Sequence, residues 1–180
     1  MSPAIVPEVS SAQPTGRVAV VTGGGTAGHV LPALAVAEAL VDLGHPMSGI
    51  RYIGAQRGVE AILVPPTGFP YTLFDVVGVQ RSLSTRNAAF MPKLMRAARQ
   101  AQRLLGRERP KVVVSVGGYA SLPAVLAAHR LRIPIVVVSY DKVPGRASRL
   151  ASRRAAVCAV AFPGSPLPRA VLTGAPVRRA

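Results

Sequence analysis

The sequence predicts an α/β fold, a Rossmann-like parallel sheet with flanking helices. Short runs rich in β-branched residues alternate along the chain with longer patterns rich in Ala and Leu, which is typical of βαβ units. The β-branched runs are apolar throughout, as expected for strands that helices cover on both faces. The length of 180 residues suits one full domain, since domains commonly have about 100 to 200 residues.

The elements follow in order along the chain. Strands are expected at residues 18–21, 50–53, 111–116, 135–139 and 156–161. Helices are expected near residues 32–43, 92–105, 122–130 and 145–153. Proline opens the first two helices and lies near the start of the third, where its missing amide donor costs little. Residues 65–85 are interpreted as a strand followed by a loop, and residues 1–16 as a flexible segment before a domain that covers residues 17–180.

The composition excludes several classes of protein. With 49% hydrophobic and 16% charged residues, the chain is globular rather than disordered. It has one cysteine and no Cys/His cluster with metal-ligand spacing, so we expect neither a disulfide framework nor a metal site. We see no secretory signal and no apolar run long enough to span a membrane, so we expect a cytoplasmic protein.

The charge is strongly basic. The chain has 22 basic and 7 acidic residues, a net charge of +15. Such a field suits nucleic acid, anionic lipid or a phosphorylated substrate, although an arginine-rich genome composition would give the same excess. Nucleic acid is disfavoured, because stacking aromatics are scarce, with 4 Tyr, 4 Phe and no Trp.

Two glycine turns carry the functional signal. The first, Gly23-Gly24-Gly25-Thr26-Ala27-Gly28-His29, joins the first strand to the first helix. Glycines let the backbone approach a phosphate closely, and a helix N-terminus adds free amides, so this turn predicts an anion site. A dinucleotide site is disfavoured because residues 49–57 contain no acidic residue, while a plain tight turn stays as the alternative.

The second turn, Gly117-Gly118-Tyr119, follows the strand at residues 111–116. Turns at the carboxyl ends of parallel strands open into the same crevice. We therefore expect the two glycine turns to face each other, with the second either lining the ligand or only shaping the chain reversal.

The motifs resemble a known family. The segments GGGTAGHVLPALAVAEAL, IGAQRGVEAILVP, VVVSVGGYASLPAVLAAHRLRIPIVVV, VPGRASRLASRRA, AFPGSP and VLTGAPVR occur in the order seen in the N-terminal half of the MurG family, within glycosyltransferase family 28. The resemblance covers residues 17–180. It implies one half of a GT-B fold. It also implies the acceptor-binding side of a transferase that moves GlcNAc from UDP-GlcNAc to undecaprenyl-pyrophosphoryl-MurNAc-pentapeptide (lipid I) in peptidoglycan synthesis, with no cofactor or metal.

The resemblance also implies roles for individual residues. His29 would either take the proton from the attacking hydroxyl or only orient the phosphate. The acceptor, a polyprenyl-diphosphate-linked sugar, would contact Gly23, Gly24, Gly25, Thr26, Gly28, Gly117, Gly118 and Tyr119. Arg81 would either pair with a phosphate or carboxylate of the acceptor or be solvated. Asp141 and Lys142 are expected to contact the acceptor from a segment that departs from the family pattern. The family's H-E-Q-N segment is replaced here by Ser139-Tyr140-Asp141-Lys142. A non-catalytic lipid-diphosphate-binding protein, or a decayed fragment of such an enzyme, is therefore the alternative.

Two partners follow from the same resemblance. The sequence ends about where the family's linker leads into its donor domain, so we expect UDP-sugar binding only together with a C-terminal donor domain. Either a separately encoded chain supplies that domain, or the chain remains from a divided gene. The predicted helix near residues 92–105, with the residues just before and after it, carries apolar side chains beside a basic rim: Phe90, Met91, Leu94, Met95 and Leu105 beside Lys93, Arg96, Arg99, Arg103 and Arg107. This pattern predicts peripheral docking on the anionic inner face of the cell membrane, or else a packed helix with a solvated charged face.

Overall fold

A computed structural model describes residues 18–76, 78 and 90–178. It confirms the α/β class, with a seven-stranded sheet in the order β3-β2-β1-β4-β5-β6-β7. Every neighbouring pair of strands is parallel. The strands are β1 (Ala19–Thr22), β2 (Ile50–Ala55), β3 (Tyr71–Phe74), β4 (Val112–Ser115), β5 (Ile135–Ser139), β6 (Val157–Val160) and β7 (Ala170–Leu172).

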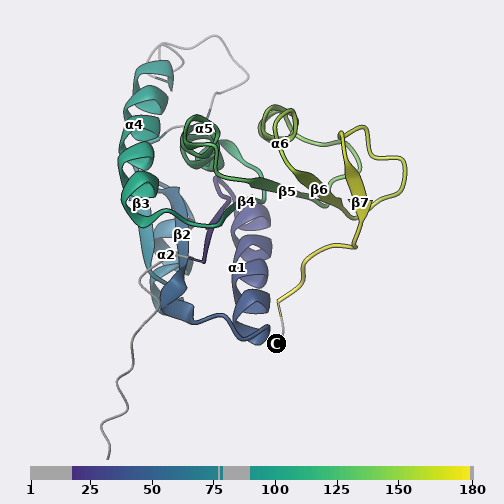
Figure 1. The fold of residues 1–180 in the computed structure, drawn as a ribbon, viewed down its shortest axis with the longest axis horizontal. Coiled ribbons are helices and arrows are strands. Elements are labelled where there is room, and N and C mark those ends of the chain that lie inside the picture. Colours follow the sequence, from purple (N-terminus) through teal and green to yellow (C-terminus); the bar gives the residue numbers. More distant parts are fainter. Residues whose placement is uncertain (1–17, 77, 79–89, 179–180) are drawn as a thin grey trace, which may run out of the picture.

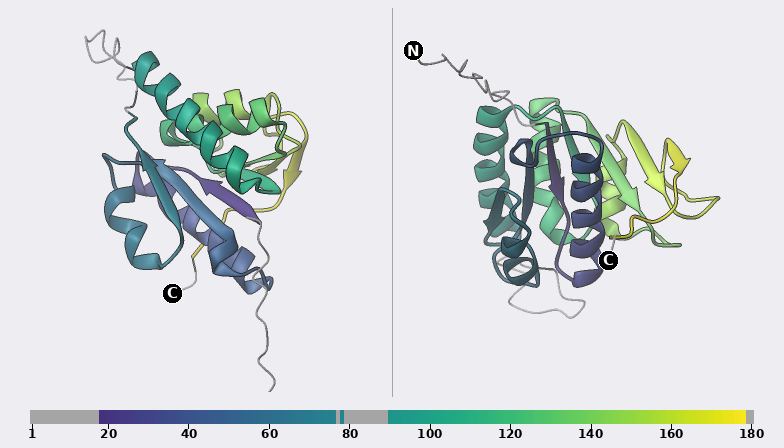
Figure 2. Two further views of the ribbon diagram at one scale, coloured as in Figure 1. Left: turned by 60° about the vertical axis from the view of Figure 1, so that its left-hand side comes forward. Right: turned by 90° about the horizontal axis from the view of Figure 1, so that it is seen from below.

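Helices cover both faces of this sheet (Figures 1 and 2). The helices are α1 (Ala27–Asp42), α2 (Glu60–Leu63), α4 (Phe90–Glu108), α5 (Leu122–Leu131) and α6 (Arg146–Ser152). The core on one face joins Val20 and Val113 to α4, α5 and α6, whereas the core on the other joins Val21 and Val114 to α1. Successive strand residues point to opposite faces, so the continuous apolar runs fill both cores at once.

The first helix begins earlier than predicted. α1 starts at Ala27, and Pro32 lies inside it rather than opening it. Proline has no amide hydrogen, so the carbonyl of Gly28, four residues earlier, loses its usual helical donor. The hydroxyl of Tyr140 donates to that carbonyl instead. A hydrogen bond from the residue after a distant strand therefore replaces the donor that the proline lacks. No pattern in the sequence near Pro32 predicts this hydrogen bond.

Other differences concern short elements. The strand expected within residues 65–85 is β3. The helix α2 and the edge strand β7 were not predicted, because one has four residues and the other has three, all of them exposed. A helix of one turn is too short to show a 3.6-residue period, and the exposed strand β7 shows no buried apolar run.

Helix α4 packs its apolar side against the core. Leu94 and Leu105 are buried there, while Met91 is exposed. Lys93 forms an ion pair with Asp75, with 2.9 Å between Nζ and Oδ2. The exposed residues of the basic face are Arg96, Arg99, Arg103 and Arg107. The alternative of a packed helix with a solvated charged face thus explains why Leu94 and Leu105 are apolar. Within the described ranges, the helices are all too short or too polar to cross a bilayer.

Candidate functional site

The two glycine turns meet at the carboxyl edge of the sheet. They follow β1 and β4, the adjacent strands where the sheet order reverses, which is the position at which open α/β sheets bind ligands. The amide of Gly24 donates to the carbonyl of Gly117 at 3.3 Å. A Cβ on Gly118, whose φ is +77°, would lie 1.8 Å from the oxygen of Gly24. The expectation that the turns face each other is confirmed, and their backbones are in direct contact.

Only part of the first turn can offer amides to a ligand. The Gly24 amide is bound to Gly117, and the Gly25 amide donates to Oε1 of Glu60 at 2.8 Å. The amides of Ala27 and Gly28 belong to the first turn of α1, where no earlier helical carbonyl can accept them. A Cβ on Gly28 would meet only Oγ1 of Thr26, at 3.6 Å. The open donors therefore lie at the start of α1, beside Gly28, rather than along the whole glycine run.

Glu60 is the functional residue that sequence reasoning missed. It is fully buried, and its Oε1 also accepts the amide of Ala55 at 3.4 Å. Glycines make room for it, since a Cβ on Gly24 would lie 2.0 Å from Oε1 and one on Gly58 2.4 Å from Oε2. Among the described residues, its Oε2 has no hydrogen-bond partner. A lone acidic residue in the apolar segment GVEAILVP was the available signal.

Two tyrosines support the turn from the protein side. The buried hydroxyl of Tyr52 donates to the carbonyl of Gly23 at 2.7 Å. Burial, and secondly the charge of Glu60, raises the pKa of Tyr52 and that of Tyr119. The ring of Tyr119 lies against Gly25, where a Cβ would come within 2.5 Å of Cε1. The two rings therefore contact the turn at Gly23 and at Gly25.

His29 lies in the first turn of α1, next to Gly28. Its Nδ1 is 3.1 Å from Oγ1 of Thr26, and its ring is tilted against that of Tyr140, with 6.3 Å between centroids. Burial lowers the pKa of His29, and the charges of Asp141 and Glu60 oppose that shift in part. The neutral imidazole that prevails at pH 7 can accept a proton.

Tyr140 was not among the predicted site residues, but its hydroxyl donates to the Gly28 carbonyl at the site. The remaining predicted residues are Asp141, Lys142 and Arg81. Asp141 and Lys142 follow Tyr140 on an exposed turn, and Asp141 acts on His29 through its charge. Arg81 lies outside the described residues.

In the part of the chain that the structure describes, no group of three or more His, Cys, Asp or Glu is arranged to hold a metal ion.

Comparisons with known proteins identify the family of the chain. Residues 19–160 match the glycosyltransferase family 28 N-terminal domain. The chain is 40% identical over 159 residues to the UDP-N-acetylglucosamine--N-acetylmuramyl-(pentapeptide) pyrophosphoryl-undecaprenol N-acetylglucosamine transferase of Cutibacterium acnes, covering 88% of this chain and 42% of that protein. It is 42% identical over 163 residues to the transferase of the same name from Anaeromyxobacter dehalogenans, with 88% and 42% covered.

Solved structures show the same fold. MurG of Acinetobacter baumannii superposes with a TM-score of 0.76 and 29% identity, covering 91% of this chain and 47% of that one. The UDP-N-acetylglucosamine 2-epimerase of Rickettsia bellii has a TM-score of 0.58 at 16% identity, with 88% of this chain and 45% of that one covered, and shares the fold alone. The chain spans less than half the length of the curated relatives named above.

Proposed function

Because the chain belongs to glycosyltransferase family 28, through the N-terminal domain of that family, we propose that it is the acceptor-binding half of a transferase. The reaction moves GlcNAc from UDP-GlcNAc to lipid I, as the names of its relatives describe for those proteins. The single observation that carries the proposal is the open start of α1, where free amides lie beside His29 and a glycine without side-chain obstruction.

The diphosphate of the acceptor binds at this helix start. Amides of the first helical turn and the positive end of the helix dipole favour a negatively charged group there. Gly28 lets the phosphate approach the backbone, and Glu60 and Tyr52 hold the preceding glycines from behind. The neighbouring residues Gly117, Gly118 and Tyr119 complete the wall of the crevice against which the acceptor sugar rests.

His29 then acts as the general base. With Nδ1–H donated to Oγ1 of Thr26, the lone pair of Nε2 is free to take the proton of the acceptor hydroxyl. The hydroxyl oxygen forms the new bond to the anomeric carbon as the bond to UDP breaks, and UDP leaves with the electron pair. The charges of Asp141 and Glu60, which raise the pKa of His29 against its burial, favour the imidazolium that forms.

The UDP-sugar itself is held by a donor domain, either in the same protein or in a separate chain. A polyprenyl acceptor resides in a membrane, so we place the protein on the inner membrane face. The exposed end of α4, with Met91 and the face that carries Arg96, Arg99, Arg103 and Arg107, supports that placement. Apolar and basic side chains together suit an anionic bilayer surface.

Gly28→Ala tests the acceptor site with little disturbance of the fold. The new methyl group meets only Thr26 in the chain itself, and alanine suits a helix better than glycine by about 0.5–1 kcal/mol. We expect unchanged or higher thermal stability but at least roughly tenfold weaker binding of a short-chain, soluble prenyl-diphosphate-MurNAc-pentapeptide, because the methyl group displaces the phosphate.

Gly106→Ala is the matched control, since Gly106 lies in α4 with nothing within 4 Å of the added Cβ. It should leave binding unchanged. Equal affinity of Gly28→Ala and the native chain would exclude the start of α1 as the diphosphate site.

A second function is favoured by one contact. Tyr140, which replaces a family residue, donates to Gly28 and lies against His29. If this phenol obstructs the hydroxyl that His29 must deprotonate, the chain binds a lipid diphosphate without catalysing transfer. Transfer assays with a donor domain added in trans separate the two: product that disappears in His29→Gln supports the transferase, whereas tight binding without product supports the binding protein.

A further inference from the structure

The carbonyl of Gly28 is bound by a side chain from another part of the sheet. In a regular helix the amide of residue 32 would donate to this carbonyl, but Pro32 has no amide hydrogen. The hydroxyl of Tyr140, the residue directly after β5, donates to it instead. Because β4 lies between β1 and β5 in the sheet, this hydrogen bond ties the start of α1 to a strand that is not next to β1.

The Gly28 carbonyl and the amide of His29 belong to the same peptide group. That amide donates to the carbonyl of Thr26 at 3.0 Å, so Thr26 and Tyr140 hold the two ends of one planar unit. Glycine has no Cβ, and its backbone therefore resists rotation of this unit less than other residues would. The two hydrogen bonds supply the missing restraint, and they fix the backbone of His29 relative to the open amides of Ala27 and Gly28.

The imidazole of His29 is also held on several sides. Its Nδ1 lies 3.1 Å from Oγ1 of Thr26. The ring of Tyr140 lies 6.3 Å away between centroids and is tilted by 55°, an arrangement that is common in aromatic pairs. A Cβ on Gly117, whose φ is +97°, would come within 3.3 Å of Nε2. Tyr140 therefore contacts both the peptide group that carries the His29 amide and the ring of His29 itself.

Tyr140 is itself held in place and keeps its proton. Its half-buried ring packs against the core on the α1 side of the sheet. Burial, and secondly the charge of Asp141, raises the pKa of Tyr140 to about 12. The phenol is therefore a hydrogen-bond donor at neutral pH. The donor is present and oriented before any ligand binds, which lowers the cost of ordering a binding site.

We propose that Tyr140 is a positioning residue of the acceptor site, where its hydroxyl substitutes for the amide that Pro32 lacks. It holds the first turn of α1 in the orientation that binds a diphosphate and presents Nε2 of His29 to the acceptor. This inference rests on the proposed function, because it takes the start of α1 as the diphosphate site. It makes the phenol a support of that site rather than an obstruction.

Pro32→Ala gives a double-mutant cycle, because alanine supplies the missing helical amide. Tyr140→Phe removes the hydroxyl and keeps the ring. With Pro32 in place, Tyr140→Phe should weaken binding of the soluble prenyl-diphosphate-MurNAc-pentapeptide roughly three- to tenfold, since it removes one hydrogen bond that orders the site. With Pro32→Ala present, the same change should alter the affinity by less than about twofold. Pro32→Ala itself should raise the melting temperature, because proline is unfavourable inside a helix.

The ring resonances of the histidines give a second readout that needs no ligand. The chain has three histidines, and the C2 proton of each can be followed by NMR. Tyr140→Phe should shift the resonance of His29 and leave that of His45 unchanged, and the shift should be much smaller when Pro32→Ala is present. Tyr71→Phe is the matched control, because it removes the same hydroxyl from an exposed tyrosine at the amino end of β3. It should change neither the His29 resonance nor the affinity.

Gly28→Ala separates failure of this inference from failure of the proposed function. Suppose that Gly28→Ala weakens binding, while Tyr140→Phe either has no effect or weakens binding equally in both backgrounds. The diphosphate site then stands, and Tyr140 does not position it. Tighter binding in Tyr140→Phe would show that the phenol obstructs the site and would overturn the inference as well. If neither Gly28→Ala nor Tyr140→Phe weakens binding, the start of α1 is not the diphosphate site and both proposals are wrong.

Discussion

The buried carboxyl of Glu60 should stabilise the first glycine turn by accepting hydrogen bonds. Glu60→Ala removes the acceptor of the Gly25 and Ala55 amides, while Glu60→Gln keeps an acceptor oxygen of the same reach and removes the charge. The two variants therefore separate the hydrogen bonds from the negative charge. Glu38→Ala, which removes a partly exposed carboxylate paired with Arg178, is the control.

The structure sets the size of the effect. A buried donor left without an acceptor costs about 1–3 kcal/mol. The hydrogen bond from Gly25 is 2.8 Å long, so we expect its loss to cost an energy in the middle of that range. The hydrogen bond from Ala55 is longer, at 3.4 Å, so we expect its loss to cost an energy at the lower end. We expect Glu60→Ala to lower the free energy of unfolding by about 2–4 kcal/mol, or the melting temperature by roughly 5–15 °C for a chain of this size. Glu60→Gln and Glu38→Ala should each stay within about 1 kcal/mol.

Urea unfolding and thermal unfolding, each followed by far-UV circular dichroism, measure these differences, and equal urea slopes show that the unfolded states are comparable. Binding of the soluble lipid-diphosphate analogue is measured on the same samples. A melting temperature for Glu60→Ala within about 1 °C of the native value would refute the reasoning. If Glu60→Gln were as unstable as Glu60→Ala, the charge rather than the acceptor would be responsible.

Three further changes test the same site by urea unfolding. Tyr52→Phe leaves the Gly23 carbonyl without its 2.7 Å donor and should cost about 1–2 kcal/mol, so an unchanged midpoint would contradict that bond. Gly118→Ala adds a Cβ 1.8 Å from the Gly24 oxygen at a φ of +77°, and a loss below about 2 kcal/mol would mean that the turns separate easily. Because burial lowers the pKa of His29 below 6.5, the unfolded chain takes up the proton first. The stability linked to His29 is thus complete above about pH 6.5 and falls as the pH drops toward the folded pKa, a loss that His29→Gln should reduce.

Much of the fold was predictable because its signals are local. The apolar runs that became β1, β2, β4, β5 and β6 are read from consecutive residues, as are the two glycine turns that follow β1 and β4. Parallel strands place their carboxyl ends at one edge, so the position of the candidate anion site followed from the sequence.

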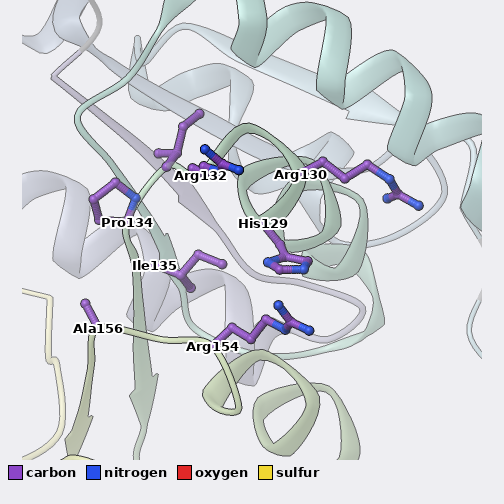
Figure 3. A pocket seen from close by; sticks show the side chains of 8 residues that line it. His129, Arg130, Arg132, Pro134, Ile135, Arg154 and Ala156 are labelled. Atoms are coloured by element: carbon purple, nitrogen blue, oxygen red, sulfur yellow. The ribbon is translucent and has the colours of Figure 1, made fainter.

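Contacts between distant segments were beyond that reach. No sequence pattern near residue 28 shows that Tyr140, 112 positions away, supplies the donor that Pro32 lacks. Likewise, no local pattern shows that Glu60 accepts the hydrogen bond of the Gly25 amide. The space between His129 and Arg154 also forms only where the end of α5 and the residues after α6 come together (Figure 3). Local sequence preference thus determined the types of residue at the turns and the places where the chain reverses. Packing between elements far apart in the chain determined which amides stay open, which carbonyls are already bound and which charges stay unpaired.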